Sequence, residues 1–256
     1  MKFNGTNTTA LGLLVSKTTG FFDMPDRGSP VVYDWGDSLQ PLLDDEDIFW
    51  KALTMTVEFV YDSRITGNTY DQTIAALKAY DEFVLEQTFA SGANGVFTVK
   101  VQSSQKEQSL GPLTKASIVL YNRLPLFTGV LPTASDSSSS IGGYSFYQFG
   151  LVVSSKQNFG GIGELKPSKE TTYMSDNKKS DVRGLNQLSL DCWIVGANTA
   201  DLIKKVAEFK KLLSLPNAKV LKYGGKTKSV FLSNGFKVEV HGKRAAKFNL
   251  KLNEIE

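Results

Sequence analysis

The chain has 256 residues, of which 41% are hydrophobic, which suffices for one large core or for two cores of ordinary domain size. It has no run of about 18 apolar residues and no apolar signal-peptide region at its start, so we expect a soluble protein without a membrane anchor, made in a cytoplasm. Its single cysteine, Cys192, excludes an internal disulfide framework and a multi-cysteine zinc site.

Charge is divided unevenly along the chain. Residues 1–143 carry 10 basic and 16 acidic side chains, whereas residues 144–256 carry 19 and 10. The net charges of the two halves are therefore −6 and +9, against +3 for the whole chain. Such polarity suits the pairing of acidic and basic faces of neighbouring subunits, or the binding of nucleic acid by a basic surface. Two independently solvated surfaces are the simpler alternative.

The first fifty residues predict a short strand followed by a long loop. Residues 11–16 form an apolar strand, and residues 21–30 contain too many turn formers for regular structure. Residues 31–35 are expected to be a strand or a strand edge. The acidic run at residues 44–47 lacks the alternate acids, the central glycine and the closing glutamate of an EF-hand, so it predicts a solvated loop without metal.

A strand, a polar turn and a helix occur twice, at residues 53–84 and 185–213. In each strand, apolar side chains recur at every second position, which places them on one face. The pattern Asn-Thr-x-Asp follows at residues 68–71 and 198–201, where Asn or Thr caps a first helical turn and Asp favours its positive end. The apolar sets are Leu53, Met55, Val57 and Phe59 in the first copy, and Leu188, Leu190, Cys192 and Ile194 in the second.

The apolar faces of the two helices match at a constant offset with helical spacing. The matched pairs are Ile74 with Ile203, Leu77 with Val206, Tyr80 with Phe209, Phe83 with Leu212, and Val84 with Leu213. Residues 11–16 likewise match residues 149–154. We therefore predict an internal duplication, although two strand-helix pairs can look alike by chance.

This duplication predicts a first unit at residues 1–130, a Ser/Gly linker at residues 131–143 and a second unit at residues 144–256. The expected fold class is α+β and β-rich, with two tandem β-barrel or split-barrel-like units that each carry one α-helix. Further strands are expected at residues 96–101 and 116–121 in the first unit. In the second unit they are expected at residues 218–223, 228–232, 236–241 and 246–252.

Local motifs of catalysis are missing. The glycines at residues 160–163 are not followed by a capped helix, which argues against a dinucleotide-binding loop. Gly224 and Gly225 precede a predicted strand, so they indicate a hairpin turn rather than a phosphate-binding loop. His241 is the only histidine, and no serine nucleophile elbow occurs. Carboxylate pairs can be assembled by folding without a local motif. We nevertheless expect no enzyme, and we assign no catalytic, cofactor-binding or metal-binding residue.

The order of elements resembles the tail-tube and baseplate-ring proteins of tailed bacteriophages, above all the distal tail protein and related hub proteins. The likeness is carried by Phe3-Asn4-Gly5, by residues 11–16, by residues 25–37 and by the strand-helix at 53–84. It implies tail-tube-like modules in a hexameric or trimeric ring within the virion tail. The expected partners are further copies of the chain and tail tube and hub or tip proteins, and the resemblance also allows DNA passing through the lumen. The second half departs from the distal tail family, whose second module is a galectin-like sandwich.

Two sets of residues are candidate binding surfaces. The aromatic residues of the long loop and its flank are candidate subunit contacts, because such side chains concentrate at interface centres; they can instead pack on their own domain. The lysines of the second helix are a candidate basic surface for nucleic acid, and exposed aromatics on a β-sandwich suit carbohydrate as a third possibility. The residues are Phe21, Phe22, Trp35 and Trp50 in the first set, and Lys204, Lys205, Lys210 and Lys211 in the second.

Overall fold

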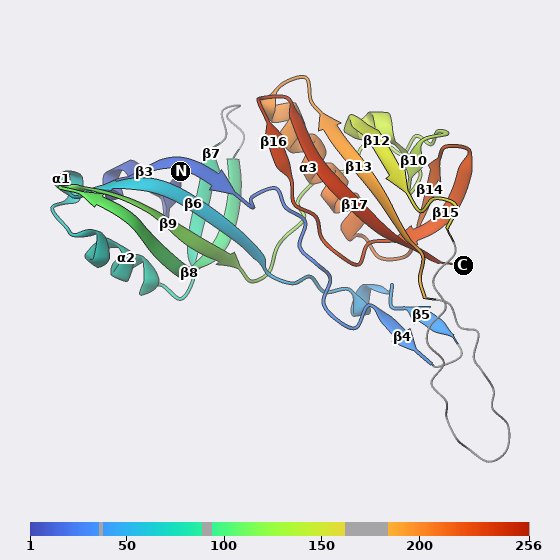
Figure 1. The fold of residues 1–256 in the computed structure, drawn as a ribbon, viewed down its shortest axis with the longest axis horizontal. Coiled ribbons are helices and arrows are strands. Elements are labelled where there is room, and N and C mark those ends of the chain that lie inside the picture. Colours follow the sequence, from blue (N-terminus) through green and yellow to red (C-terminus); the bar gives the residue numbers. More distant parts are fainter. Residues whose placement is uncertain (36–37, 89–93, 162–183, 256) are drawn as a thin grey trace, which may run out of the picture.

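The computed structural model describes residues 1–35, 38–88, 94–161 and 184–255. These residues form a β-rich α+β fold with two main antiparallel sheets and few helices, which confirms the expected class at this level. Each sheet has its own hydrophobic core, and Figure 1 shows the two units side by side. In the described residues neither sheet closes into a barrel, so the barrel form expected from the sequence is not observed.

The first unit is a seven-stranded sheet in the order β2-β1-β7-β8-β9-β6-β3. Its strands are β1 (Lys2–Phe3), β2 (Thr6–Asn7), β3 (Leu13–Thr19), β6 (Leu53–Asp62), β7 (Phe83–Thr88), β8 (Asn94–Leu110) and β9 (Leu113–Asn122). Buried and partly exposed residues alternate along β6, and its inward side chains meet those of β9, with Val57 opposite Ile118. Helix α2 (Tyr70–Lys78) adds Ile74 and Leu77 to this core, and α1 (Ser63–Thr66) is a single turn.

The second unit is an eight-stranded sheet in the order β11-β10-β14-β15-β17-β13-β12, with β16 paired to β17. Its strands are β10 (Ser140–Ile141), β11 (Tyr144–Ser145), β12 (Leu151–Gln157), β13 (Gln187–Val195), β14 (Lys219–Tyr223), β15 (Lys226–Phe231), β16 (Glu239–His241) and β17 (Ala245–Ile255). Leu190 of β13 lies opposite Leu250 of β17, and helix α3 (Thr199–Ser214) buries Phe209 in the same core. Cys192 is fully buried there, as its place in the strand pattern predicts.

The strand orders of the two sheets correspond position by position, which is the structural signature of a duplication. Strands β1, β2, β3, β6, β7, β8 and β9 occupy the places of β10, β11, β12, β13, β14, β15 and β17. Small irregularities correspond as well. In both units a short 3-10 helix ends at a glycine with positive φ, Gly12 (74°) or Gly150 (61°). The next strand then shifts register against its neighbour, after Val15 in one unit and after Val153 in the other.

The helices correspond in their first halves, where the predicted capping by Asn or Thr is confirmed. The N-cap side chains of Thr69 and Asn198 accept hydrogen bonds from Gln72 N and Asp201 N, and they have the same offset as the matched apolar pairs. The sequence prediction is wrong at the end of the first helix. Helix α2 ends at Lys78, before Tyr80, and Phe83 begins strand β7. The tertiary reason is that residues 83–88 pair with β8, and hydrogen bonding within the sheet overrides the helical spacing.

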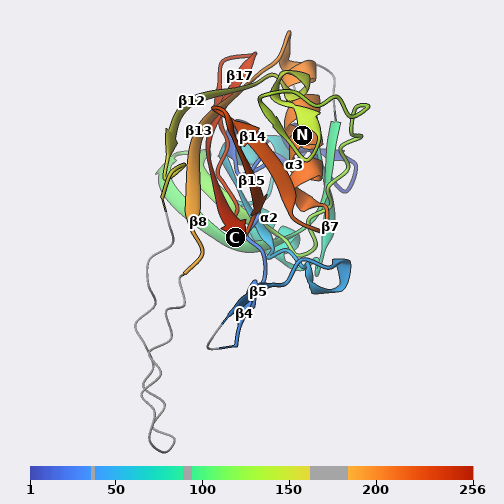
Figure 2. The ribbon, with the colours of Figure 1, turned by 90° about the vertical axis from the view of Figure 1, so that its right-hand side faces the viewer.

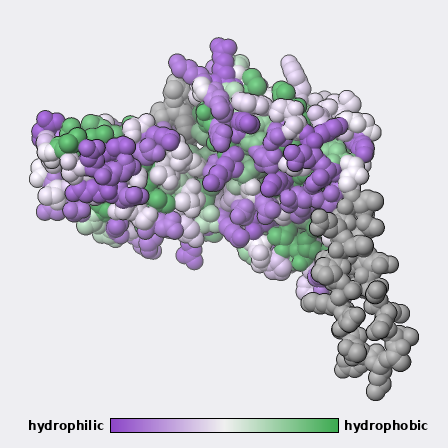
Figure 3. Space-filling view, viewed as in Figure 1, coloured by the Kyte–Doolittle hydropathy of each residue, from purple (hydrophilic) through white to green (hydrophobic). Residues whose placement is uncertain are grey.

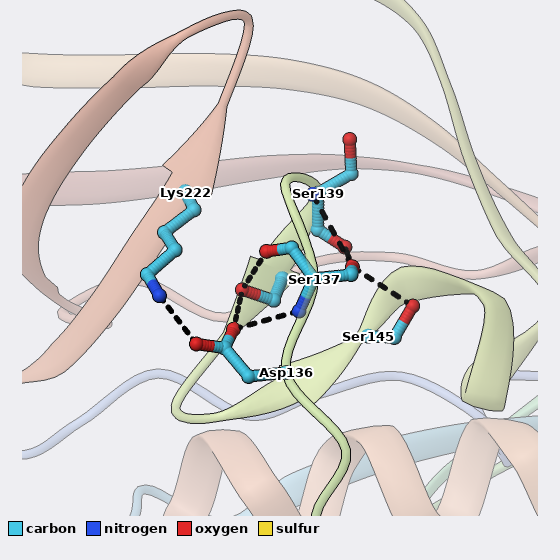
Figure 4. A network of polar contacts seen from close by, with 6 residues as sticks. Asp136, Ser137, Ser139, Ser145 and Lys222 are labelled. Carbon is cyan, nitrogen blue, oxygen red and sulfur yellow. Dashed lines mark hydrogen bonds and ion pairs between the residues drawn. The ribbon is translucent and has the colours of Figure 1, made fainter.

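The serine-rich segment between the units is held to the second sheet by a polar network (Figure 4). The Asp136 carboxylate accepts hydrogen bonds from Ser137 N (2.8 Å) and Ser140 Oγ (2.5 Å), and it pairs with Lys222 of β14. These bonds, the one from Lys222 first, lower the pKa of Asp136 to about 2. Ser140 belongs to β10, so the predicted linker at residues 131–143 overlaps the first strand of the second unit.

Candidate assembly interface

Residues 20–52, which we call the bridging segment, connect β3 to β6 of the first unit and contact the second unit toward both of their ends. Met24 forms an isolated antiparallel bridge with Phe236, through N–H to O=C hydrogen bonds of 2.9 and 3.0 Å. The Arg27 amide donates to Ser233 O at 3.1 Å. Gly235 allows this close approach, because a Cβ there would lie 1.9 Å from Met24 O. The main chain of one unit therefore extends the hydrogen bonding of the other.

Side chains strengthen the same contact. Asp23 Oδ1 accepts a hydrogen bond from Val238 N at 2.8 Å, and Asp26 Oδ1 accepts one from Gly235 N at 2.7 Å. From helix α3, Lys210 Nζ donates to Asp23 O at 2.5 Å. Burial raises the pKa of Asp23, and burial lowers the pKa of Lys210 to about 8 although Asp23 opposes that shift. Both shifts have burial as their first cause, so this contact shields two ionisable groups from water.

Apolar contacts hold the far end of the bridging segment. Trp50 packs edge-on against Phe127, with ring centroids 5.3 Å apart, and both side chains lie against the core of the second unit. Leu43 O accepts a hydrogen bond from Asn217 N at 2.8 Å, beyond the end of α3. The bridging segment is therefore fastened at both ends to the second unit.

The acidity of the first half of the chain lies in this segment. The bridging segment contains eight acidic and two basic residues, so it carries the whole net charge of −6 found in residues 1–143. The remaining residues of that half carry as many basic as acidic side chains. The segment lies on the unit whose sequence has a net charge of +9, so the charge split of the sequence corresponds to a contact between the two units.

The middle of the bridging segment forms a hairpin arm that stands away from the body. Strand β4 (Val32–Asp34) pairs only with β5 (Leu39–Pro41) in a separate two-stranded sheet among the described residues. Figures 1 and 2 show this arm projecting beyond the second unit, and Figure 3 shows hydrophobic surface gathered where it leaves the body. Tyr33 and Trp35 are 48% and 61% exposed, and their ring centroids lie 4.4 Å apart.

A cleft of about 620 Å³ separates the end of β3 in the first unit from β16 in the second. Helix α3 forms its floor with Leu202, Ile203 and Val206. Its rim carries Lys17, Lys237 and His241 together with Asp23 and Glu239. We call this space the inter-unit cleft. Both of its walls end in a strand edge: β3 is the last strand of its sheet, and β16 pairs only with β17 among the described residues.

The four candidate interface aromatics occupy different environments. Phe21 is 5% exposed and packs edge-on against Phe97 in the first core, with ring centroids 5.4 Å apart. Phe22 is partly buried and lies between the two cores, and Trp50 is partly buried against the second. Trp35 alone of the four is well exposed, so it is the one that remains available to another molecule.

The four candidate lysines of α3 do not form one exposed patch. Lys205 pairs with Asp201 at 2.9 Å, and Lys210 is turned toward the bridging segment. Lys204 is well exposed and lies 3.7 Å from Glu208, and Lys211 is partly exposed. A separate basic group, which the sequence analysis did not single out, lies on the second sheet, where Lys247 stands over the ring of Trp193 at 5.8 Å. The regular alternation of β17 with Lys247 and Lys251 was the available signal.

The structure also places the remaining residues that the sequence analysis singled out. His241 is half exposed and its ring lies 5.1 Å from that of Trp193. Gly224 and Gly225, both with positive φ, form the predicted hairpin turn between β14 and β15. Parts of the segments at residues 25–37 and 160–163, namely residues 36–37 and 162–163, lie outside the described residues.

Within the described ranges, no cluster of three or more His, Cys, Asp or Glu side chains is arranged to hold a metal ion. No described helix combines the length and the apolar character needed to span a membrane. In comparisons with known proteins, no family model and no curated protein matches the chain.

Proposed function

We propose that the chain is a structural component of a bacteriophage tail tip or baseplate, a distal tail or hub protein that forms a ring between the tail tube and the tip. The supporting observation is the contact made by the bridging segment. One unit reaches onto a second unit of the same strand order through backbone hydrogen bonds and apolar anchors. In a ring of modules, every module needs a side-by-side contact with the next. The contact between the two units of one chain is already of this kind.

Unpaired strand edges support the same proposal. Strands β2 and β3 end the first sheet, and β11 and β12 end the second, with no further partner among the described residues. Exposed edges promote association with other chains, and cyclic assembly is one way to cover them. Three chains would then give six related units, and six chains would give a larger ring of the same kind.

Mass measurement tests this proposal. Native mass spectrometry of the purified full chain should find trimers or hexamers, and negative-stain images should show rings with a central opening. Antibodies against the chain should label the tail tip of virions. A chain that stays monomeric at every concentration, and that is absent from virions, would remove the proposal.

A second candidate is nucleic-acid binding, favoured by the charge of +9 on residues 144–256 and by the stacking of Lys247 on Trp193. If the basic unit lines a channel, binding should be weak, independent of sequence and steeply reduced by salt. Fluorescence anisotropy with labelled DNA at two salt concentrations measures this. A binding constant that does not change with salt would exclude phosphate contacts as its source.

A further inference from the structure

We propose that the inter-unit cleft of one chain receives the hairpin arm of a second copy, with the arm lying along the free edge of β16 and Trp35 entering the cleft. This inference rests on the proposed ring and names the surfaces that join neighbouring chains. It starts from two features of the described residues, the apolar lining of the inter-unit cleft and the strand edges of β16 and β3 beside it.

The first feature is the apolar floor of the cleft. Leu202, Ile203 and Val206 of α3 line it from below, and Val240, which is 46% exposed, lines it from β16. A volume of about 620 Å³ is in the range of pockets that enclose a small ligand or one large side chain with its neighbours. An aromatic side chain entering it would remove apolar surface of both partners from water.

The second feature is the pair of strand edges. The three residues of β16 (Glu239–His241) pair with β17 on one side only, and β3 ends the first sheet. Strands β4 and β5 of the arm are also three residues long and pair only with each other in the described part of the chain. An extended segment adds to such an edge through main-chain hydrogen bonds, while side chains in the adjacent pocket give specificity. Each strand of the arm matches β16 in length, and pairing with one of them would give β16 a second neighbouring strand.

Complementary charge favours the arm of a second copy over a neutral strand as the occupant of the cleft. The arm belongs to the bridging segment, whose net charge is −6. Residues 237–247, which form β16, the turn and the start of β17, contain four basic residues and one acidic residue. The exposed acids Asp44, Asp45 and Glu46 at the base of the arm complement that hairpin. Within one chain, the bridging segment already contacts the basic second unit. The proposed contact would form the same acidic-to-basic pairing between two chains.

Cross-linking between two single-cysteine variants tests the contact directly. Cys192 is buried, and burial raises its pKa to about 12, so the native thiol does not react. Ser38→Cys on the arm and Val240→Cys on β16 are prepared separately as full chains, mixed and treated with a short bis-maleimide. We expect a product of twice the chain mass that contains one copy of each variant, because the two thiols meet only between copies.

The matched control replaces the arm variant with Tyr147→Cys, because Tyr147 is 89% exposed and is outside both the arm and the lining of the cleft. It should give far less product with Val240→Cys. Trp35→Ala should weaken self-association at least ~10-fold, since buried aromatic anchors carry much of the binding energy of an interface. Tyr147→Ala should leave self-association unchanged, and circular dichroism verifies the fold of each variant.

The possible results distinguish failure of the arm contact from failure of the proposed ring. Rings that form normally, with no preferred cross-link and no effect of Trp35→Ala, would overturn the arm contact and leave the ring standing. A chain that remains monomeric under all conditions would overturn both. An arm that cross-links to another tail protein, and never to a copy of this chain, would also overturn the proposed occupant.

Discussion

At the scale of single residues, glycines mark the places where the two units are built alike. Gly12 and Gly150 have positive φ at the same point of the fold, and a Cβ at either would approach a backbone carbonyl oxygen, 2.8 Å from Asp62 O or 2.2 Å from Val195 O. Only glycine meets both demands, since other residues rarely adopt this conformation and all of them have a Cβ. The duplicated positions are therefore constrained by backbone geometry.

Gly12→Ala should cost more stability than Gly67→Ala. Both glycines have φ of 74° at the end of a short helix, but a Cβ at position 67 meets nothing within 4 Å. Gly67→Ala should cost about 1–2 kcal/mol from the left-handed conformation alone. Gly12→Ala should cost at least ~1 kcal/mol more, because the chain must also move away from Asp62. Urea unfolding of the two variants measures the difference, and equal losses would mean that the close approach is unimportant.

Lys210 makes the stability of the protein depend on pH. Its pKa is lowered to about 8 in the folded chain from 10.5, so between these values the unfolded chain binds more protons. The free energy of unfolding should therefore rise with pH across that window, by up to about 3 kcal/mol. Below pH 8 the desolvated charge costs its full amount of stability.

Lys210→Met isolates this contribution. The variant should lack the rise, so the stability difference between it and the native chain should change between pH 7 and pH 10.5. Lys219, whose pKa burial also lowers to about 8, is present in both proteins and its effect cancels. Parallel pH profiles of the two proteins, measured by denaturant unfolding, would show that the Lys210 ammonium keeps its normal hydration.

At the scale of elements, strands were predicted well because their signal is local. The period of two along β6, β13 and β17 is visible in the sequence, and the structure pairs these strands through the buried sets that the pattern gives. The end of α2 was missed for the opposite reason. Tyr80, Phe83 and Val84 continue a helical spacing, and only pairing with β8, which begins at Asn94, makes residues 83–88 a strand.

The candidate site was harder to predict than the strands. Counting charge by halves gave the correct polarity, but only a count over residues 20–52 locates the acidity in one segment. The aromatic residues of that segment carry no local sign of whether they are buried, and Phe21 and Trp35 end in opposite environments. Contacts such as that of Met24 with Phe236 join residues far apart in the sequence, and no periodic pattern encodes them.

Gly235→Ala should release the bridging segment from the second unit. A Cβ there would lie 1.9 Å from Met24 O and 2.5 Å from Pro25 C, so the segment must move. We expect a loss of about 1–3 kcal/mol in stability and faster proteolysis within residues 20–52. Gly160→Ala is the matched control, because its Cβ meets only the tip of the flexible Lys226 side chain at 3.4 Å. If both variants resist protease equally, the close packing at Gly235 does not hold the segment in place.

At the scale of the whole molecule, two sheets with one strand order carry unlike surfaces. The first half is acidic through its bridging segment and the second is basic, and the residues of the arm are not among those that line the cleft. A contact between unlike patches is heterologous, and such contacts produce closed rings when the rotation per subunit closes, or open filaments when it does not. The angle between neighbours therefore decides between the two.

Repetition of the fold within one polypeptide has a genetic consequence. In an assembly of single-module chains, every codon change alters all positions around the axis at once. Here the strand order of β1 to β9 is encoded again by β10 to β17, so selection acts on each copy separately. The two units differ in this way: α3 has 16 residues and α2 has nine. One chain thereby presents two different surfaces on units of the same strand order.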